Sequence, residues 1–197
     1  MSISRGISCG ALVVFVAACG GSDAPKAEVT TQAPAATQAP AAVEVTAAPA
    51  RAVLRNRSGS EVGTVNFRQE GNEVVVEINA RNLEGGKRAI HIHDVGSCEA
   101  PFDSSGPHFN PGNTEHGLNN PAGPHAGDLP NMTVDPDDGI GRDVFRTSRV
   151  TLVPGQPNSL LDGDGTSIII HAGTDDETSQ PAGNAGDRIV CGVITAA

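Results

Sequence analysis

Apolar and polar residues alternate over short segments of this 197-residue chain, and a period of two is typical of β-strands with one buried face. In residues 73–80 the even positions hold Val, Val, Ile and Ala, whereas Glu77 and Asn79 lie on the opposite face. A hairpin turn is expected at residues 69–72. Further strands are expected at residues 61–67, 89–93, 142–153, 166–171 and 188–194. Short strands separated by glycine and proline predict an all-β domain, an antiparallel sandwich or flattened barrel.

Two long segments, residues 97–131 and 172–187, have no strand pattern. The first is rich in proline and holds half of the histidines, and the second is rich in glycine and acidic residues. Loops of this length in a compact domain are either disordered or functional. Their ligand-type side chains favour function, and bound metal would supply free energy to order them.

Histidine is rare in this chain and confined to one region. The chain has six histidines and neither tryptophan nor tyrosine. The histidines are His91, His93, His108, His116, His125 and His171. Imidazole is the commonest protein ligand for copper and zinc. Six imidazoles and a nearby carboxylate suffice for two ions that share one ring, so the pattern predicts a two-metal site.

The first two histidines stand two residues apart within a predicted strand. His91 and His93 therefore emerge on one face, whereas Ile90 and Ile92 point to the other. This arrangement suits two ligands of one ion. The pair by itself is weak evidence, because cupins and lactamase-type metallo-hydrolases use similar pairs, although their acidic ligands do not match this sequence.

The following group is more specific, because His108, His116 and His125 precede Asp128 at short intervals. Three imidazoles and one carboxylate form a closed tetrahedral zinc site with no open position, which is typical of a structural ion. The alternative for Asp128 is a turn or capping residue, since Gly127 precedes it.

The N-terminal segment is expected to direct export. Residues 1–18 carry one positive charge and an apolar stretch too short to span a bilayer, and they end in Val-Ala-Ala before Cys19. This resembles a bacterial lipoprotein signal, in which the cysteine becomes lipidated; an ordinary secretory peptide is the alternative. Residues 19–50, rich in alanine and proline, are expected to form a disordered linker, which leaves residues 51–197 as one domain.

The net charge and the cysteine content limit the possible binding partners of the protein and its cellular compartment. A net charge of −10 argues against nucleic acid, whose phosphates require a basic face. The membrane is expected as a partner only through the lipid anchor, with the domain facing the periplasm or the cell exterior. Cys98 and Cys191 remain after export, and an even pair indicates a disulfide, with two free thiols as the alternative. Monomer and homodimer both stay open.

An acidic, glycine-rich segment before His171 has two possible interpretations, a calcium loop or a turn. Residues 161–167, Leu-Asp-Gly-Asp-Gly-Thr-Ser, resemble the start of a calcium loop. The twelfth position, counted from Asp162, is Gly173, where a calcium loop needs a bidentate glutamate. We therefore expect a glycine turn that leads into the strand before His171.

Five segments carry a family resemblance. They are Ala-Ile-His-Ile-His-Asp (89–94), Gly-Pro-His-Phe-Asn-Pro (106–111), Pro-His-Ala-Gly-Asp-Leu (124–129), Ile-Ile-Ile-His-Ala-Gly (168–173) and Gly-Asn-Ala-Gly-Asp-Arg-Ile-Val-Cys-Gly-Val-Ile (183–194). From about residue 52 to the C-terminus, the chain resembles a copper/zinc superoxide dismutase of the bacterial secreted type. The resemblance implies a Greek-key sandwich or flattened barrel with a metal-binding loop and an electrostatic loop.

The resemblance also implies a ligand set for each metal. The implied copper ligands are His91, His93, His108 and His171. The implied zinc ligands are His108, His116, His125 and Asp128. His108 would therefore bridge the two ions as an imidazolate. The same resemblance pairs Cys98 with Cys191.

Two further residues match functional positions of the family. Asp175 matches the carboxylate that holds one ligand from each site, here His91 and His116, and Asp176 is the less favoured occupant of that role. Arg188 matches the arginine that binds superoxide beside the copper.

The chain departs from the family along the expected anion channel. Many members place a lysine and a threonine six to seven residues before the arginine, where this chain has Pro181 and Ala182. Attraction of superoxide is then expected to depend on Arg188, the copper and any basic residue that folds nearby, with a weaker dependence on ionic strength than a lysine-lined channel would give.

The resemblance implies an enzyme that dismutates superoxide to O₂ and hydrogen peroxide. Copper that cycles between two oxidation states would carry the redox chemistry, and a structural zinc would support the His108 bridge. Two other functions stay open: a non-catalytic copper or zinc carrier on the same scaffold, and an anchored domain that metals only stabilise. The presence of all four copper ligands and Arg188 favours the enzyme.

Overall fold

The structure is a computed structural model and describes residues 47–197. The predicted signal peptide (1–18), Cys19 and most of the predicted linker lie outside the described residues. The first strand begins at Ala50, which is buried. This strand therefore begins one residue before residue 51, the start of the domain expected from the sequence.

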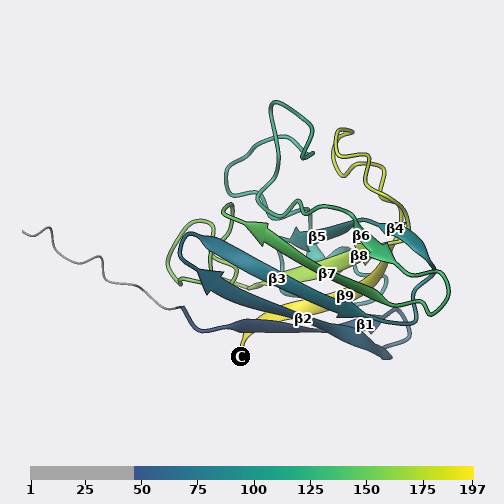
Figure 1. Cartoon of the computed structure of the whole chain (residues 1–197). Helices are drawn as coiled ribbons and strands as arrows, with labels where there is room; N and C mark the ends of the chain where they lie inside the picture. The colour runs from purple at the N-terminus through teal and green to yellow at the C-terminus, as the bar shows by residue number, and fades with distance from the viewer. Residues whose placement is uncertain (1–46) are drawn as a thin grey trace, which may run out of the picture. The chain divides into compact units, whose positions relative to one another are not determined.

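Within residues 47–197 the strands form one antiparallel sheet. They are β1 (Ala50–Asn56), β2 (Glu61–Glu70), β3 (Glu73–Ala80), β4 (Gly86–Arg88), β5 (Ile90–His93), β6 (Met132–Val134), β7 (Gly141–Thr147), β8 (Thr166–His171) and β9 (Arg188–Ala196). The order across the sheet is β4-β6-β7-β3-β2-β1-β9-β8-β5. Only Ala89 separates β4 from β5, the two outermost strands, so the sheet curls into a nearly closed barrel (Figure 1). The all-β fold class predicted from the sequence is confirmed.

The barrel interior is filled by one cluster of apolar side chains from the inward faces of the strands. Its largest fully buried members are Phe67, Leu54, Ile90, Ile92, Leu129, Met132, Leu152, Leu160, Ile168 and Ile170. Burial of each large aliphatic or aromatic side chain stabilises the fold by about 1.5–3 kcal/mol. The strands β5 and β8, which carry His91, His93 and His171, are therefore packed on the core of the domain.

The observed strands match the predicted ones unevenly. β3 and β8 have the predicted bounds, whereas β2 and β9 run further, to Glu70 and Ala196. The hairpin turn is consequently reduced to Gly71 and Asn72. The expected turn before β8 is present, with Gly165 N–H donating to Asp162 O at 2.9 Å.

The predicted strand at 142–153 was too long, because β7 ends at Thr147. Thr147 Oγ1 accepts a hydrogen bond from Arg149 N–H at 3.2 Å, which turns the chain away from the sheet. Val150 and Leu152 are buried all the same, as part of an irregular segment that packs on the core. Alternating burial, with an isolated bridge between Thr151 and Ser159 instead of a strand, explains the error.

The two long loops emerge on the same side of the barrel (Figure 1). Residues 97–131 lie along β5, where Ile92 N–H donates to Gly127 O and Phe109 N–H donates to Ile92 O, both at 2.9 Å. A Cβ at position 127 would clash with Ile92 O, so this close approach requires glycine. A disulfide between Cys98 and Cys191 joins the loop to β9. Within the described residues, no helix is long and apolar enough to cross a membrane.

Candidate metal centre

Four imidazoles converge at the junction of β5, β8 and the first long loop. His91 and His93 lie on β5, His171 ends β8, and His108 follows a turn of the loop. β5 and β8 pair directly, with His91 opposite Ile169. One nitrogen from each of the four rings lies within 4.8 Å of the others, and all four side chains are buried.

In each of these four rings, one nitrogen has a partner and the other has none. His93 Nδ1–H donates to Gly106 O at 2.9 Å, and His171 Nδ1–H donates to Gly186 O at 3.1 Å. These backbone contacts fix the tautomer and leave a lone pair on Nε2. The nitrogens without a partner are His91 Nδ1, His93 Nε2, His108 Nε2 and His171 Nε2. Buried polar atoms without partners are rare, and four together indicate an ion site.

A second group of ligands lies on the loop itself. The Nδ1 atoms of His108, His116 and His125 lie 2.9, 3.0 and 3.4 Å from Asp128 Oδ1. A tetrahedral zinc ion with bonds of about 2.0 Å places its ligand atoms about 3.3 Å apart, close to these separations. Asp128 Oδ2 accepts hydrogen bonds from Gly117 N–H and His125 N–H, each 2.9 Å, which orients Oδ1 toward the histidines.

His108 belongs to both groups. Its Nδ1 lies 2.9 Å from Asp128 Oδ1, and its Nε2 is one of the four unpartnered nitrogens. A single ring thus presents one nitrogen to each of two adjacent sites. The predicted pair of metal groups that share this histidine is confirmed.

Asp175 connects the two groups from the second long loop. Its Oδ2 accepts from His91 Nε2–H at 2.8 Å, and its Oδ1 accepts from His116 Nε2–H at 3.0 Å. Gly183 has φ +61, and a Cβ there would overlap both Asp175 and His116. The carboxylate therefore needs glycine beside it to reach both rings. Asp176, the alternative, instead accepts from nearby groups of its own loop, such as Ser179 N–H at 2.7 Å.

Burial and charge divide the histidines into two electrostatic classes. Burial lowers the pKa of His91 to about 4 and that of His171 to about 3, and it lowers the pKa of His93 as well. These rings are neutral at pH 7 and ready to bind a cation. Burial opposes the charged form of His116 too, but hydrogen bonds with Asp128 and Asp175 raise its pKa to about 9.

The pKa values of the two carboxyl groups shift in the opposite direction to that of His116. Burial favours the neutral form of Asp128, but His108, His116 and Gly117 N–H hold its pKa far below the ordinary value. Contacts with His116 and His91 likewise outweigh burial and lower the pKa of Asp175. Both carboxylates are therefore ionised throughout the neutral range, as a metal ligand and an orienting group require.

Arg188 lies close to the four-histidine group. After burial and neighbouring histidines, its charge is a further cause of the lowered pKa of His93 and His171. Its Nη1–H groups donate to Phe102 O at 2.9 Å and to Ser105 Oγ at 2.8 Å. The side chain is half-buried, so it is fixed in place and still reaches solvent.

The structure adds residues that the sequence did not single out. The side-chain amide of Asn131 binds the backbone N–H and C=O of Asp175, and the side-chain amide of Gln180 binds the backbone N–H and C=O of His116. Gly106 and Gly186 provide the carbonyls that orient His93 and His171. No sequence signal distinguishes these residues, since asparagine, glutamine and glycine are common in loops.

Comparison with known proteins agrees with this geometry. A family model described as copper/zinc superoxide dismutase (SODC) matches residues 61–194. The chain belongs to the copper/zinc superoxide dismutase family. Superoxide dismutase [Cu-Zn] 1 of Aquifex aeolicus (strain VF5) is 45% identical over 145 residues, which are 73% of this chain and 85% of the relative.

Similarity also extends to Bacillus subtilis. Superoxide dismutase-like protein YojM of strain 168 is 42% identical over 144 residues, 72% of this chain and 73% of the relative. The crystal structure of a SOD-like protein from Bacillus subtilis has a TM-score of 0.69 and 40% identity, and the match covers 73% of this chain and 96% of that chain. These matches confirm the copper/zinc superoxide dismutase family and fold for residues 61–194.

The two ions of a copper/zinc superoxide dismutase fit these residues. Four imidazole nitrogens without other partners suit copper, which accepts nitrogen ligands in both of its common oxidation states. Three imidazoles and an ionised carboxylate at tetrahedral separations suit a structural zinc. His91, His93, His108 and His171 would hold copper, and His108, His116, His125 and Asp128 would hold zinc.

Proposed function

We propose that this protein dismutates superoxide, converting two superoxide anions and two protons to O₂ and hydrogen peroxide. The observation that carries the proposal is the His108 ring, which presents Nδ1 to the zinc group and Nε2 to the four-histidine group. A carrier or a stabilising site has no need for a ring that joins two unlike groups.

Bound copper supplies the one-electron chemistry, and the protein residues supply binding, orientation and a proton site. Arg188 binds the superoxide anion, because its guanidinium is fixed beside the histidines and partly open to solvent. An arginine offers several N–H donors and keeps its charge at all accessible pH values.

His108 Nε2 holds one of the two protons of the reaction. This nitrogen is buried, has no hydrogen-bond partner and belongs to the four-histidine group. The ring would hold this proton at Nε2, while Nδ1, 2.9 Å from Asp128 Oδ1, keeps the ring in place. The second proton is available from solvent beside Arg188.

The test is an assay of superoxide consumption by the purified protein loaded with copper and zinc. Arg188→Ala is expected to keep both metals and lose at least about tenfold in kcat/KM, because the anion loses its charged partner. Arg142→Ala, an exposed arginine on β7, is the matched control and is expected to keep full activity. A loaded protein that consumes no superoxide would reject the enzyme in favour of a carrier.

We also propose that the protein is exported and anchored by a lipid on Cys19, with residues 1–18 removed. The Val-Ala-Ala-Cys sequence supports lipidation, and the Cys98–Cys191 disulfide suits an oxidising compartment. Intact mass of the mature protein should show acyl chains on Cys19, and Cys19→Ala should release it from the membrane fraction. A mature mass without acyl chains would favour an ordinary secretory peptide. Sedimentation velocity then decides between monomer and homodimer.

A further inference from the structure

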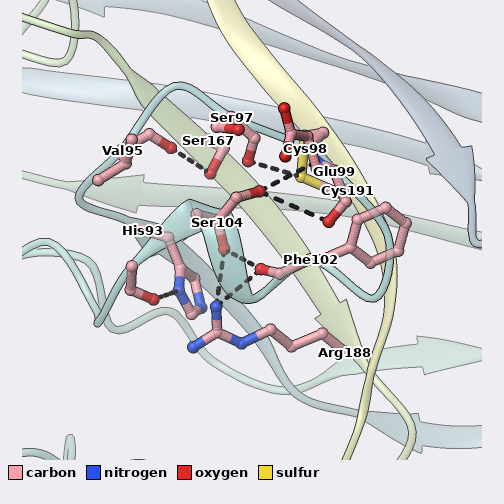
Figure 2. Close-up of a disulfide and its surroundings, with 12 residues drawn as sticks. His93, Val95, Ser97, Cys98, Glu99, Phe102, Ser104, Ser167, Arg188 and Cys191 are labelled. Carbon is pink, nitrogen blue, oxygen red and sulfur yellow. Dashed lines mark hydrogen bonds between the residues drawn. A yellow bond between two sulfur atoms is a disulfide. The ribbon is translucent and has the colours of Figure 1, made fainter.

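The segment between the disulfide and His108 provides both hydrogen bonds that hold Arg188. Arg188 Nη1 donates to Phe102 O at 2.9 Å and to Ser105 Oγ at 2.8 Å, across 86 and 83 residues of sequence. Figure 2 shows the guanidinium directed at this segment, on the same side as the His93 ring. Within the described residues, Nε and Nη2 of Arg188 make no hydrogen bond to the protein.

Ser105 is placed to act on Arg188 rather than on solvent. Its side chain is fully buried, and its single hydroxyl proton goes to Phe102 O at 2.8 Å. The Oγ lone pairs are therefore free to accept from Arg188. Phe102 O accepts from Ser105 N–H, Ser105 Oγ–H and Arg188 Nη1–H together, so the serine and the arginine form one small network.

Phe102 is itself fixed by the disulfide. Its ring is buried against Ile169 and Cys191, with Cys98 packed at the edge (Figure 2). The backbone at Phe102 has φ 82, a left-handed conformation that non-glycine residues rarely adopt. Ring burial and the Glu99 O acceptor for Phe102 N–H, at 2.6 Å, keep the carbonyl in this orientation.

Both hydrogen-bond partners of Arg188 are neutral, and the Asp103 carboxylate acts on its charge without a hydrogen bond. A carboxylate partner would fix the side chain equally well but would cancel its charge toward a substrate anion. A hydroxyl and a carbonyl fix Nη1 and leave the positive charge, with Nη2 and Nε, available. The same segment continues to Gly106, whose carbonyl accepts from His93 Nδ1–H. One stretch of five residues thus sets the position of the guanidinium relative to a metal-binding histidine.

We propose that Ser105 is a positioning residue for Arg188, acting through its buried hydroxyl to hold the guanidinium where an anion reaches both Arg188 and the four-histidine group. This inference rests on the proposed role of Arg188 in anion binding. It assigns no contact between Ser105 and the substrate.

Azide, a small anion, is the probe that tests the proposal on the copper- and zinc-loaded full chain. Ser105→Ala is expected to weaken azide binding, followed by the visible spectrum of the copper, by about three- to tenfold, the range of one ordinary hydrogen bond. The spectrum without azide should stay unchanged, because no metal ligand is altered. kcat/KM should fall by a similar factor.

Ser104→Ala is the matched control. Ser104 Oγ accepts from Glu99 N–H at 3.0 Å in the same turn and is not one of the hydrogen-bond partners of Arg188. This variant should bind azide as the wild type does. Equal losses in Ser104→Ala and Ser105→Ala would mean that general loosening of the segment causes the effect, and would overturn the proposal.

A double-mutant cycle with Arg188→Ala gives the decisive comparison. If Ser105 acts through Arg188, its replacement has no further effect on azide affinity once the arginine is absent. An equal effect in both backgrounds, or no effect in the wild-type background, overturns the proposal. Ser105→Thr keeps a hydroxyl and should restore azide affinity to within about twofold of the wild type. If Ser105→Ala fails to load metal, Ser105→Thr takes its place in the test. An azide affinity of Ser105→Thr as low as that of Arg188→Ala then counts against the proposal.

The outcomes separate this inference from the proposed function. A wild-type protein that consumes superoxide, loses activity in Arg188→Ala and tolerates Ser105→Ala refutes only the positioning role. A wild-type protein that binds azide but consumes no superoxide refutes the enzyme and leaves the effect of Ser105 on anion affinity measurable.

Discussion

The two metal groups share a histidine but are built from different kinds of structure. In the four-histidine group, His91, His93 and His171 lie on β5 and β8, which pair with each other inside the barrel. In the zinc group, every ligand lies on the irregular loop 97–131. The difference suggests that the strands preform one site, whereas the other depends on its ion for order.

Packing and hydrogen bonds agree with this contrast. His91 and His93 alternate with Ile90 and Ile92, which are fully buried in the barrel core. Asp128 instead takes its carboxylate hydrogen bonds from two N–H groups of its own loop, Gly117 and His125. Metal binding contributes to folding free energy most where the site does not exist without the metal.

The largest expected effects come from removing one ligand on each side. His171→Ala should lower superoxide consumption by about 100-fold or more, because a copper ligand is lost, and should keep zinc and loop order. His125→Ala should first lose zinc and the order of residues 97–131. Metal analysis together with hydrogen exchange checks both. Loss of zinc from His171→Ala equal to that from His125→Ala would mean that the two groups form one unit.

Removal of both ions should separate the loop from the barrel. Chelation is expected to speed amide exchange throughout residues 97–131 and to leave β3 and β8 protected. The Tm should fall by about 10 °C or more, since ligand binding at high saturation contributes several kcal/mol. Exchange measured by mass spectrometry and a thermal melt test this. Equal loss of protection in β8 would show that the four-histidine group also needs its ion.

The pH dependence of the metal-free protein should carry an acid limb from the strand-held histidines. Their pKa values, about 4 for His91 and 3 for His171, lie below the unfolded value of about 6.5. The unfolded chain then binds more protons below pH 6.5, so stability is full above that pH and falls as the pH drops toward 4. For His91 the loss is about 3 kcal/mol.

The zinc group should give a pH dependence of stability with the opposite sign. The pKa of His116 is raised to about 9, so its contribution is fully present below pH 6.5 and is lost as the pH rises through 9. Urea unfolding of the metal-free protein from pH 4 to 10 measures both limbs. His91→Asn should flatten the acid limb and keep the alkaline one; a variant that keeps both limbs unchanged would contradict this assignment.

The smallest expected effect concerns ionic strength. Pro181 stands where many family members have a lysine, so turnover should fall only weakly as salt rises. Pro181→Lys should raise the low-salt rate by about two- to threefold and steepen the salt dependence. A steep fall with salt in the wild type would show that other basic residues guide the anion.

The sequence predicted the strands with a recognisable apolar face and missed the short or charged ones. Residues 73–80 place four apolar side chains on one face and form β3 with the predicted bounds, although Val75 interrupts the alternation. Gly86–Arg88 and Met132–Val134 are three residues each, too short for a period to be visible. Their pairing with each other, and that of Val134 with Gly141 of β7, makes them strands. Tertiary contacts, rather than local preference, decide such elements.

The metal ligands were predictable because histidine and aspartate carry a chemical signature that other loop residues lack. The positioning groups were not, since Ser105, Asn131 and Gln180 have residue types common in any loop. Their roles arise from contacts across 44 to 83 residues of sequence. Only the folded arrangement reveals them.

Asn131 is the last residue of the first long loop, and its side-chain amide binds the backbone N–H and C=O of Asp175 in the second long loop. Asn131 Oδ1 accepts from Asp175 N–H at 2.8 Å, and Nδ2–H donates to Asp175 O at 2.9 Å. The side-chain amide thus makes the same pair of hydrogen bonds as a neighbouring strand residue would, and it joins the two loops. Outward movement of one loop alone would break both of these hydrogen bonds, so the movements of the two loops should be correlated.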